Sequence, residues 1–398
     1  NTTGTSNTAI GAFALDSNTT GNGNTAVGYN AVQSNSIGNS LTAIGRDALF
    51  TNTTGSDNTA LGRQTLYLNT TGSKNVAVGK AALESNSSAS NNTAVGFEAL
   101  KANTTGTQNV AVGSLALDAN TTGSQNNAVG YNALTANTTG INNDAHGHAS
   151  MLSNTSGSYN IAMGRASLDA NTSGSNNIAL GPFALTSNTT ASHNVAIGYE
   201  TLEQNTTGTQ NVAVGNFALD DNVDGSNNSA FGYASLGKNT SGDFNAAFGH
   251  GALAKNTTAN NNTAVGTDSL RENTTGAGNT GVGHDALKSN TSGAHNTALG
   301  DQSLDANTSG TRNTAIGESS LGSNTTADFS VAVGYQALSS NTTGLSNVAV
   351  GAQALKATVT GSSNTAVGRS CLQSNTASNN TAIGNRALFV NTIGANNV

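Results

Sequence analysis

The chain has 398 residues, enough for two or three globular domains, but its composition is not that of a globular protein. Charged residues make up 9% and aromatic residues 4%, tryptophan is absent, and glycine occurs 48 times. The formal net charge of −7 is scattered without a basic patch, which argues against a nucleic-acid partner.

The single Cys371 excludes an intrachain disulfide framework, and no apolar run is long enough for a membrane-spanning helix.

A glycine recurs every 17 residues from Gly11 to Gly368, and a last step of 16 residues leads to Gly384. Numbered from this glycine, the consensus repeat is G-x-x-A-L-x-x-N-T-T-G-x-x-N-T-A-V. The charges support this register independently, because 33 of the 35 charged residues fall at repeat positions 2, 3, 6, 7, 12 and 13. Charge is tolerated where side chains meet water, so these positions are predicted to be exposed corners.

Each repeat begins with a tight corner, G-x-x, whose glycine allows a positive φ or a close backbone approach. The A-L stretch at positions 4 and 5 is predicted to be a first inward strand. A longer corner, x-x-N-T-T-G-x-x, leads to N-T-A-V at positions 14 to 17, the second predicted inward strand. Asparagines at positions 8 and 14 are expected to stack their amides into ladders that satisfy turn backbone groups. Equivalent residues of successive coils are expected to stack into structural ladders, which include the glycines and asparagines Gly28, Gly45, Gly62, Gly79, Asn24, Asn58 and Asn75.

No stretch sustains a 3.6-residue apolar period, which excludes helical repeats. A 17-residue unit is too small to bury a core alone, but stacked units can share one. We therefore predict an all-β fold, a parallel β-solenoid or β-roll with two short strands per 17-residue coil. Residues 1–398 are expected to form one continuous array of about 23 coils without caps. Because the array begins and ends inside a repeat, we expect it to be a fragment of a longer chain.

Asn-Thr-Ala-Val-Gly at 24–28 and Asn-Val-Ala-Val-Gly at 75–79 resemble the head repeats of trimeric autotransporter adhesins. In those repeats an N-S-V-A-I-G type core follows a short turn similar to Thr-Thr-Gly at 53–55. The resemblance implies a left-handed parallel β-roll that trimerises on the bacterial surface and binds host matrix or other cells. Similar repeats occur in phage-like tail fibres and related surface fibres. This chain differs in its longer coil, which adds Ala-Leu and an extended corner.

The segment 143–148 is the one break in the pattern, because Asp144 stands at position 15 and His146 at the apolar position 17. Together with His148, these side chains could bind a divalent metal. The alternative, which we favour, is a tolerated defect in a redundant rod.

Asn-x-Ser/Thr occurs at position 8 in 18 of the 23 marked repeats. Such sites are N-glycosylation acceptors, but Asn-Thr-Thr-Gly is also favourable turn chemistry. Asn222 lacks the serine or threonine that a glycosylation site needs two residues later, yet the asparagine is kept. This favours the structural interpretation. The possible glycosylation sites include Asn18, Asn52, Asn103 and Asn120.

A threonine column at position 15 raises the possibility of ice binding, although only 11 of its 23 members are threonine. No Ser/His/Asp constellation, recurring carboxylate pair or phosphate loop occurs, so we predict neither an enzyme nor a cofactor. Five tyrosines share the exposed position 2 and could form a weak binding stripe for glycans or neighbouring fibres: Tyr29, Tyr131, Tyr199, Tyr233 and Tyr335.

The sequence predicts an extracellular, cell-surface fibre or adhesin shaft that mediates surface or cell–cell attachment. The thin core of each coil favours self-association, and a trimer is the favoured assembly. Host or neighbouring-cell surface molecules are the other expected partners. An ice-binding β-solenoid and a phage-like tail-fibre shaft are the alternatives.

Overall fold

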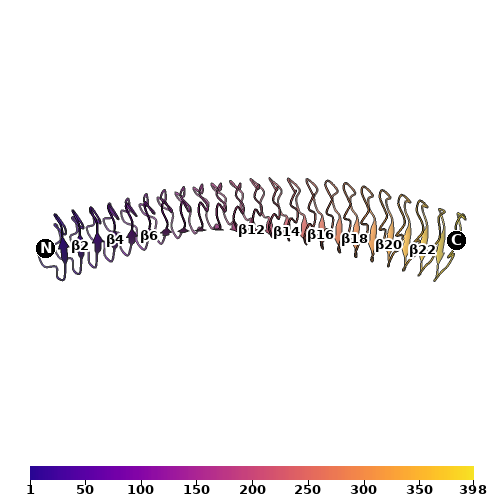
Figure 1. Ribbon diagram of the computed structural model, residues 1–398, viewed down its shortest axis with the longest axis horizontal. Coiled ribbons are helices and arrows are strands. Elements are labelled where there is room, and N and C mark those ends of the chain that lie inside the picture. The colour runs from indigo at the N-terminus through magenta and orange to yellow at the C-terminus, as the bar shows by residue number, and fades with distance from the viewer. The chain divides into compact units, whose positions relative to one another are not determined.

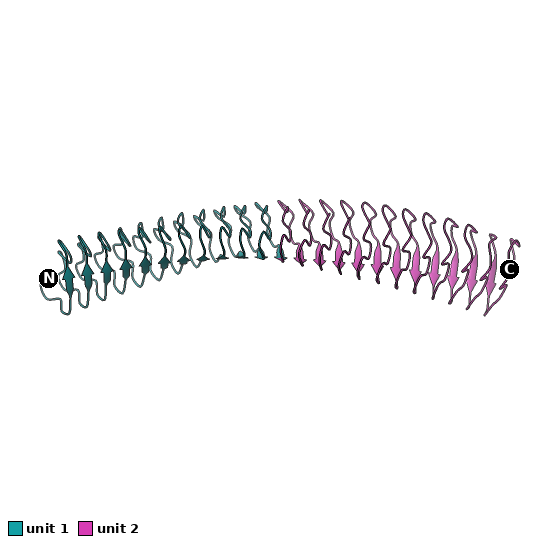
Figure 2. Cartoon of the chain, in the orientation of Figure 1, with its two compact units in different colours: residues 1–196 teal, residues 197–398 magenta.

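The computed structural model describes residues 1–398, and its regular secondary structure consists of short β-strands joined by turns (Figure 1). The structure contains no helix that is long and apolar enough to span a membrane. The chain divides into two compact units, residues 1–196 and 197–398 (Figure 2). The 17-residue repeat continues through both units, so each is a stack of similar coils.

Each coil contributes one strand of three residues, and β12 (Val195–Ile197) spans the boundary between the units. The first unit contains β1 (Thr8–Ile10), β2 (Thr25–Val27), β3 (Thr42–Ile44), β4 (Thr59–Leu61), β5 (Val76–Val78), β6 (Thr93–Val95), β7 (Val110–Val112), β8 (Asn127–Val129), β9 (Asp144–His146), β10 (Ile161–Met163) and β11 (Ile178–Leu180). The second contains β13 (Val212–Val214), β14 (Ser229–Phe231), β15 (Ala246–Phe248), β16 (Thr263–Val265), β17 (Thr280–Val282), β18 (Thr297–Leu299), β19 (Thr314–Ile316), β20 (Val331–Val333), β21 (Val348–Val350), β22 (Thr365–Val367) and β23 (Thr381–Ile383).

Within each unit, neighbouring strands pair in parallel with equivalent repeat positions opposite one another. Ala26 of β2, for example, pairs with Ala9 of β1 and with Ala43 of β3. This register stacks every column of the repeat directly on itself. The predicted all-β, parallel solenoid of 17-residue coils is therefore confirmed.

The A-L stretch is a turn, and the prediction of a second strand in each coil was wrong. The leucine at position 5 adopts a left-handed backbone, with φ of 53° at Leu185 and 52° at Leu219. A strand requires strongly negative φ. The turn is still bonded to its neighbours, because Leu219 N donates to Ser235 O of the next coil at 3.0 Å. Backbone bonds between coils thus continue outside the strands, in a conformation that hydrophobicity does not reveal.

The core is lined by alanines at positions 4 and 16 and by the leucine at position 5. Ala213, Ala218 and Leu219 are fully buried and represent these three columns in one coil. The apolar residue at position 17 points outward, contrary to prediction, since side chains of a strand alternate between its two faces. With position 16 inside, positions 15 and 17 must lie outside.

Buried asparagines at positions 8 and 14, and not the apolar residue at position 17, complete the core. Asn52 Nδ2 donates to Asn35 Oδ1 of the neighbouring coil at 2.9 Å and to Gly55 O of its own corner at 3.0 Å. In the second column, Asn75 N donates to Asn58 Oδ1 at 2.9 Å. These buried amides are hydrogen-bonded from coil to coil, and the hydrogen bonds offset the free-energy cost of removing the amides from water.

The glycine at position 1 is required by its conformation and by its neighbour. Gly28 has φ of 138°, and a Cβ there would lie 2.6 Å from the carbonyl oxygen of Gly45. No L-residue fits such a site without backbone movement. Gly45, Gly62 and Gly79 repeat this conformation in the next coils.

Candidate functional site

The outward strand face, defined as the side chains at repeat positions 15 and 17 of the strands, is the most regular exposed surface. Position 17 is apolar in every coil except at His146, yet its side chains are partly or fully exposed. Ile44 is 46% exposed and Val265 is 38% exposed. An exposed apolar column of this kind makes the outward strand face a candidate interaction surface.

Threonine and β-branched aliphatic residues dominate position 15 beside that strip. Thr25, Val76 and Val212 illustrate the column, and Asp144 is its one charged member. The alternation of small polar and aliphatic groups gives the outward strand face almost no charge. Charged residues instead occupy the corners, where their side chains meet water.

The structure brings together two of the three suggested metal ligands. His146 Nε2 lies 2.8 Å from Asp144 Oδ1, both on β9. The His148 ring instead stacks on Tyr131, with ring centroids 5.5 Å apart. No cluster of three histidine, cysteine or acidic side chains suited to a metal is present. The Asp144–His146 pair therefore satisfies two polar groups at the break in the apolar column.

The suggested glycosylation asparagines lie in the buried ladder. Asn103 Nδ2 donates to Asn86 Oδ1 at 3.1 Å and to Gly106 O at 2.9 Å. Asn120 Nδ2 makes the equivalent two bonds at 2.9 Å each, and Asn18 and Asn52 are buried in the same column. Because both amide hydrogens are used inside the coil, a glycan on this nitrogen is incompatible with the folded ladder.

The position-2 tyrosines lie on an exposed edge, but other aromatic residues extend them. Tyr199, Phe217 and Tyr233 contact edge to face, with centroids 5.6 Å and 5.7 Å apart. His250 then stacks on Tyr233 at 5.4 Å. The sequence pattern missed this row, because Phe217 stands at position 3 rather than 2 and His250 is not a tyrosine.

Carboxylates at position 6 occupy a partly dry environment on the neighbouring corner. Burial raises the pKa of Asp118, Asp169 and Asp305 above its ordinary value. At Asp220, burial and then the nearby Asp221 carboxylate raise the pKa to about 6. Burial thus disfavours the charged form of these four carboxylates.

Comparison with known proteins finds no matching family model and no matching curated protein.

Proposed function

We propose that this chain is the shaft of an extracellular, non-catalytic structural or adhesive fibre that self-associates through the outward strand face. The observation that supports this most directly is the exposed column at position 17, apolar in all coils but one. Burial against a second copy removes that surface from water. Trimerisation and attachment to host or neighbouring cells are the forms of association that the resemblance to adhesin head repeats suggests.

The available area is consistent with a stable contact. If each outward side chain exposes roughly 25–50 Å², two such side chains in each of the eleven coils of one unit present on the order of 500–1,100 Å². A standard interface buries about 800 Å² on each partner. One unit alone thus approaches the required area.

Light scattering of the full chain tests the association. We expect a mass that is a multiple of the 39.4 kDa chain, with a trimer favoured. The triple variant Val265→Lys, Leu299→Lys and Val350→Lys places three charges on the outward strand face of the second unit. It should weaken the association, so that the mass falls towards that of one chain at concentrations where the wild-type assembly persists. The matched control Thr267→Lys, Gln302→Lys and Ala352→Lys adds the same charge at corner positions and should leave the assembly intact. A wild-type chain of single mass at high concentration would refute the proposal.

Ice binding is a second candidate that the structure favours by one observation. Four threonines in register lie on the outward strand face in each unit, and neighbouring members pair directly across the sheet. The runs are Thr8, Thr25, Thr42 and Thr59, and Thr263, Thr280, Thr297 and Thr314. Thermal hysteresis that weakens in Thr280→Lys would support this function, since the run in the first unit remains intact, and freezing identical to buffer would reject it.

A further inference from the structure

The Asp144–His146 pair interrupts an otherwise uniform surface of the first unit. Both side chains stand on the outward strand face, because Ala145 between them is fully buried in the core. The side chain of Asp144 is 34% exposed and that of His146 is 44% exposed. Asp144 is the one charged member of position 15 and His146 the one member of position 17 that is not apolar, so no other coil repeats this pair.

The pair uses only part of its hydrogen-bonding capacity within the chain. His146 Nε2 lies 2.8 Å from Asp144 Oδ1. A carboxylate can accept at two oxygens, and an imidazole bonds through two nitrogens. Asp144 Oδ2 and His146 Nδ1 therefore remain available to water or to a second molecule.

The remainder of the outward strand face carries too little information to align two copies. Val78, Val95 and Val112 present the same side chain in three successive coils, and they stack directly on one another. A slip by one coil moves a partner about 4.8 Å along the stack and keeps all but one of the contacts between coils. In coiled coils, a single polar residue in an apolar seam removes the same ambiguity.

The residues next to the pair make a slipped alignment unfavourable. Val129 of β8 and Met163 of β10 flank His146 in its column. If two copies face each other one coil out of step, each His146 meets such an apolar side chain of the other copy. The free polar atoms of the pair then lose water without gaining a partner, which is unfavourable.

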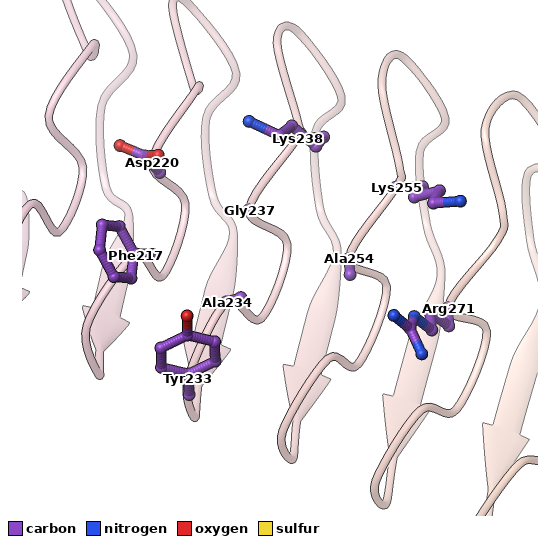
Figure 3. Close-up of a pocket in the computed structure, with 9 residues that line it drawn as sticks. All are labelled: Phe217, Asp220, Tyr233, Ala234, Gly237, Lys238, Ala254, Lys255 and Arg271. Carbon is purple, nitrogen blue, oxygen red and sulfur yellow. The ribbon is translucent and has the colours of Figure 1, made fainter.

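The charged corners do not provide a second marker of alignment, because their charges are paired within the chain. In the first unit, Lys101 Nζ lies 3.3 Å from Glu98 Oε2. In the second unit, Lys238 stands on a turn beside the strands (Figure 3), and its Nζ lies 2.8 Å from Asp221 Oδ2. A contact between copies at such corners would first have to separate these ion pairs.

We propose that the Asp144–His146 pair fixes the alignment of associating copies, so that β9 of one copy faces β9 of another. The inference rests on the self-association proposed above and specifies its partner as a second copy in one register. Symmetric association brings equivalent coils together. Asp144 and His146 of each copy then meet the same two side chains of the other. Carboxylate and imidazole are complementary hydrogen-bonding groups, so each pair gains the partners that it lacks within its own chain.

Double electron–electron resonance on the full chain tests this alignment. A nitroxide is attached at Gln125→Cys, an exposed corner position before β8, and Cys371→Ala removes the native thiol. With the pair intact, we expect one narrow distance between labels of different copies, because all copies share one register. Asp144→Thr with His146→Val restores the residues common at positions 15 and 17. This consensus variant should replace the single distance by a broad or multiple distribution, because copies offset by whole coils coexist.

Two further variants separate alignment from a local role of the pair in β9. Ile161→Thr with Met163→Val makes a matched change in the next coil, where both residues are uncharged, and should keep the single distance. Transfer of the pair to β10 combines the consensus variant with Ile161→Asp and Met163→His. This transfer should restore the single distance, which a merely structural role within β9 would not do.

An unchanged single distance in the consensus variant would overturn the inference, as would a broad distribution in the chain that keeps the pair. Failure of the transferred pair to restore one distance would also overturn it. Light scattering of the same samples reports the assembly separately. An intact mass with unchanged alignment counts against the inference alone, whereas a single-chain mass with the outward strand face unaltered refutes the association and the alignment together.

Discussion

The buried asparagine ladder gives a prediction whose size can be calculated from single contacts. Asn290 Nδ2 donates to Asn273 Oδ1 at 2.7 Å and to Gly293 O at 2.9 Å, and Asn290 Oδ1 accepts from Asn307 Nδ2 at 2.8 Å. In Asn290→Ala, Gly293 O keeps its second donor, Asn279 Nδ2, at 2.8 Å. The Asn273 oxygen and one hydrogen of Asn307 lose their partners inside the core.

Each buried polar group without a partner costs about 1–3 kcal/mol, so Asn290→Ala should destabilise its coil by about 2–6 kcal/mol. Because stability in a repeat array is local, hydrogen exchange measured by mass spectrometry is the suitable assay. Amides of residues 283–299 should exchange about 30-fold faster or more. The exposed control Glu318→Gln should change exchange by less than threefold. An equally small effect of Asn290→Ala would show that the amides do not form the stabilising ladder described here.

Three further predictions concern other columns of the repeat. Thr358 interrupts the position-8 ladder and leaves Asn341 Oδ1 buried without a partner, so Thr358→Asn should slow exchange in the adjoining coils, whereas faster exchange would contradict the ladder geometry. The pKa of Asp220 is raised to about 6 from an ordinary 3.8, so its contribution to stability is fully present below pH 4 and lost as the pH rises through 6. Asp220→Asn should therefore raise the melting temperature at pH 7 but not below pH 4, and equal gains at both pH values would exclude this cause. Cys371 is fully buried, and burial raises the pKa of its thiol. Ellman's reagent should therefore leave this thiol unmodified in the folded chain and titrate one thiol after unfolding in guanidinium. Rapid labelling of the folded chain would place Cys371 outside the core.

The sequence was sufficient to predict those parts of the fold that depend on which residue types occur at each repeat position. Repeat length, parallel stacking and exposed corners follow from where glycine and charge are allowed. The backbone of the A-L stretch could not be predicted, because Leu219 is buried in a left-handed turn as completely as it would be in a strand. Hydrophobicity reports burial and does not report φ.

The functional surfaces were harder to predict for two physical reasons. Position 17 was placed inside because it is apolar, although alternation from the buried Ala213 puts Val214 outside. The aromatic row depends on residues from successive coils, among them Tyr199, Phe217 and Tyr233, which no single repeat displays. The Asn-Thr-Thr pattern fits both a glycosylation site and a turn, and only the structure shows that the amides of Asn103 and Asn120 lie in the buried ladder.

We proposed that copies of this chain associate through the outward strand face, and a nitroxide label placed on that face tests the association. The label is attached at Val282→Cys in a chain where Cys371→Ala supplies the alanine common at that position. We predict an electron paramagnetic resonance spectrum with restricted motion and spin–spin broadening that decreases when unlabelled chain is mixed in. A label at Thr267→Cys, on a corner, should remain mobile. A narrow, mobile spectrum at Val282→Cys that dilution does not change would contradict the claim.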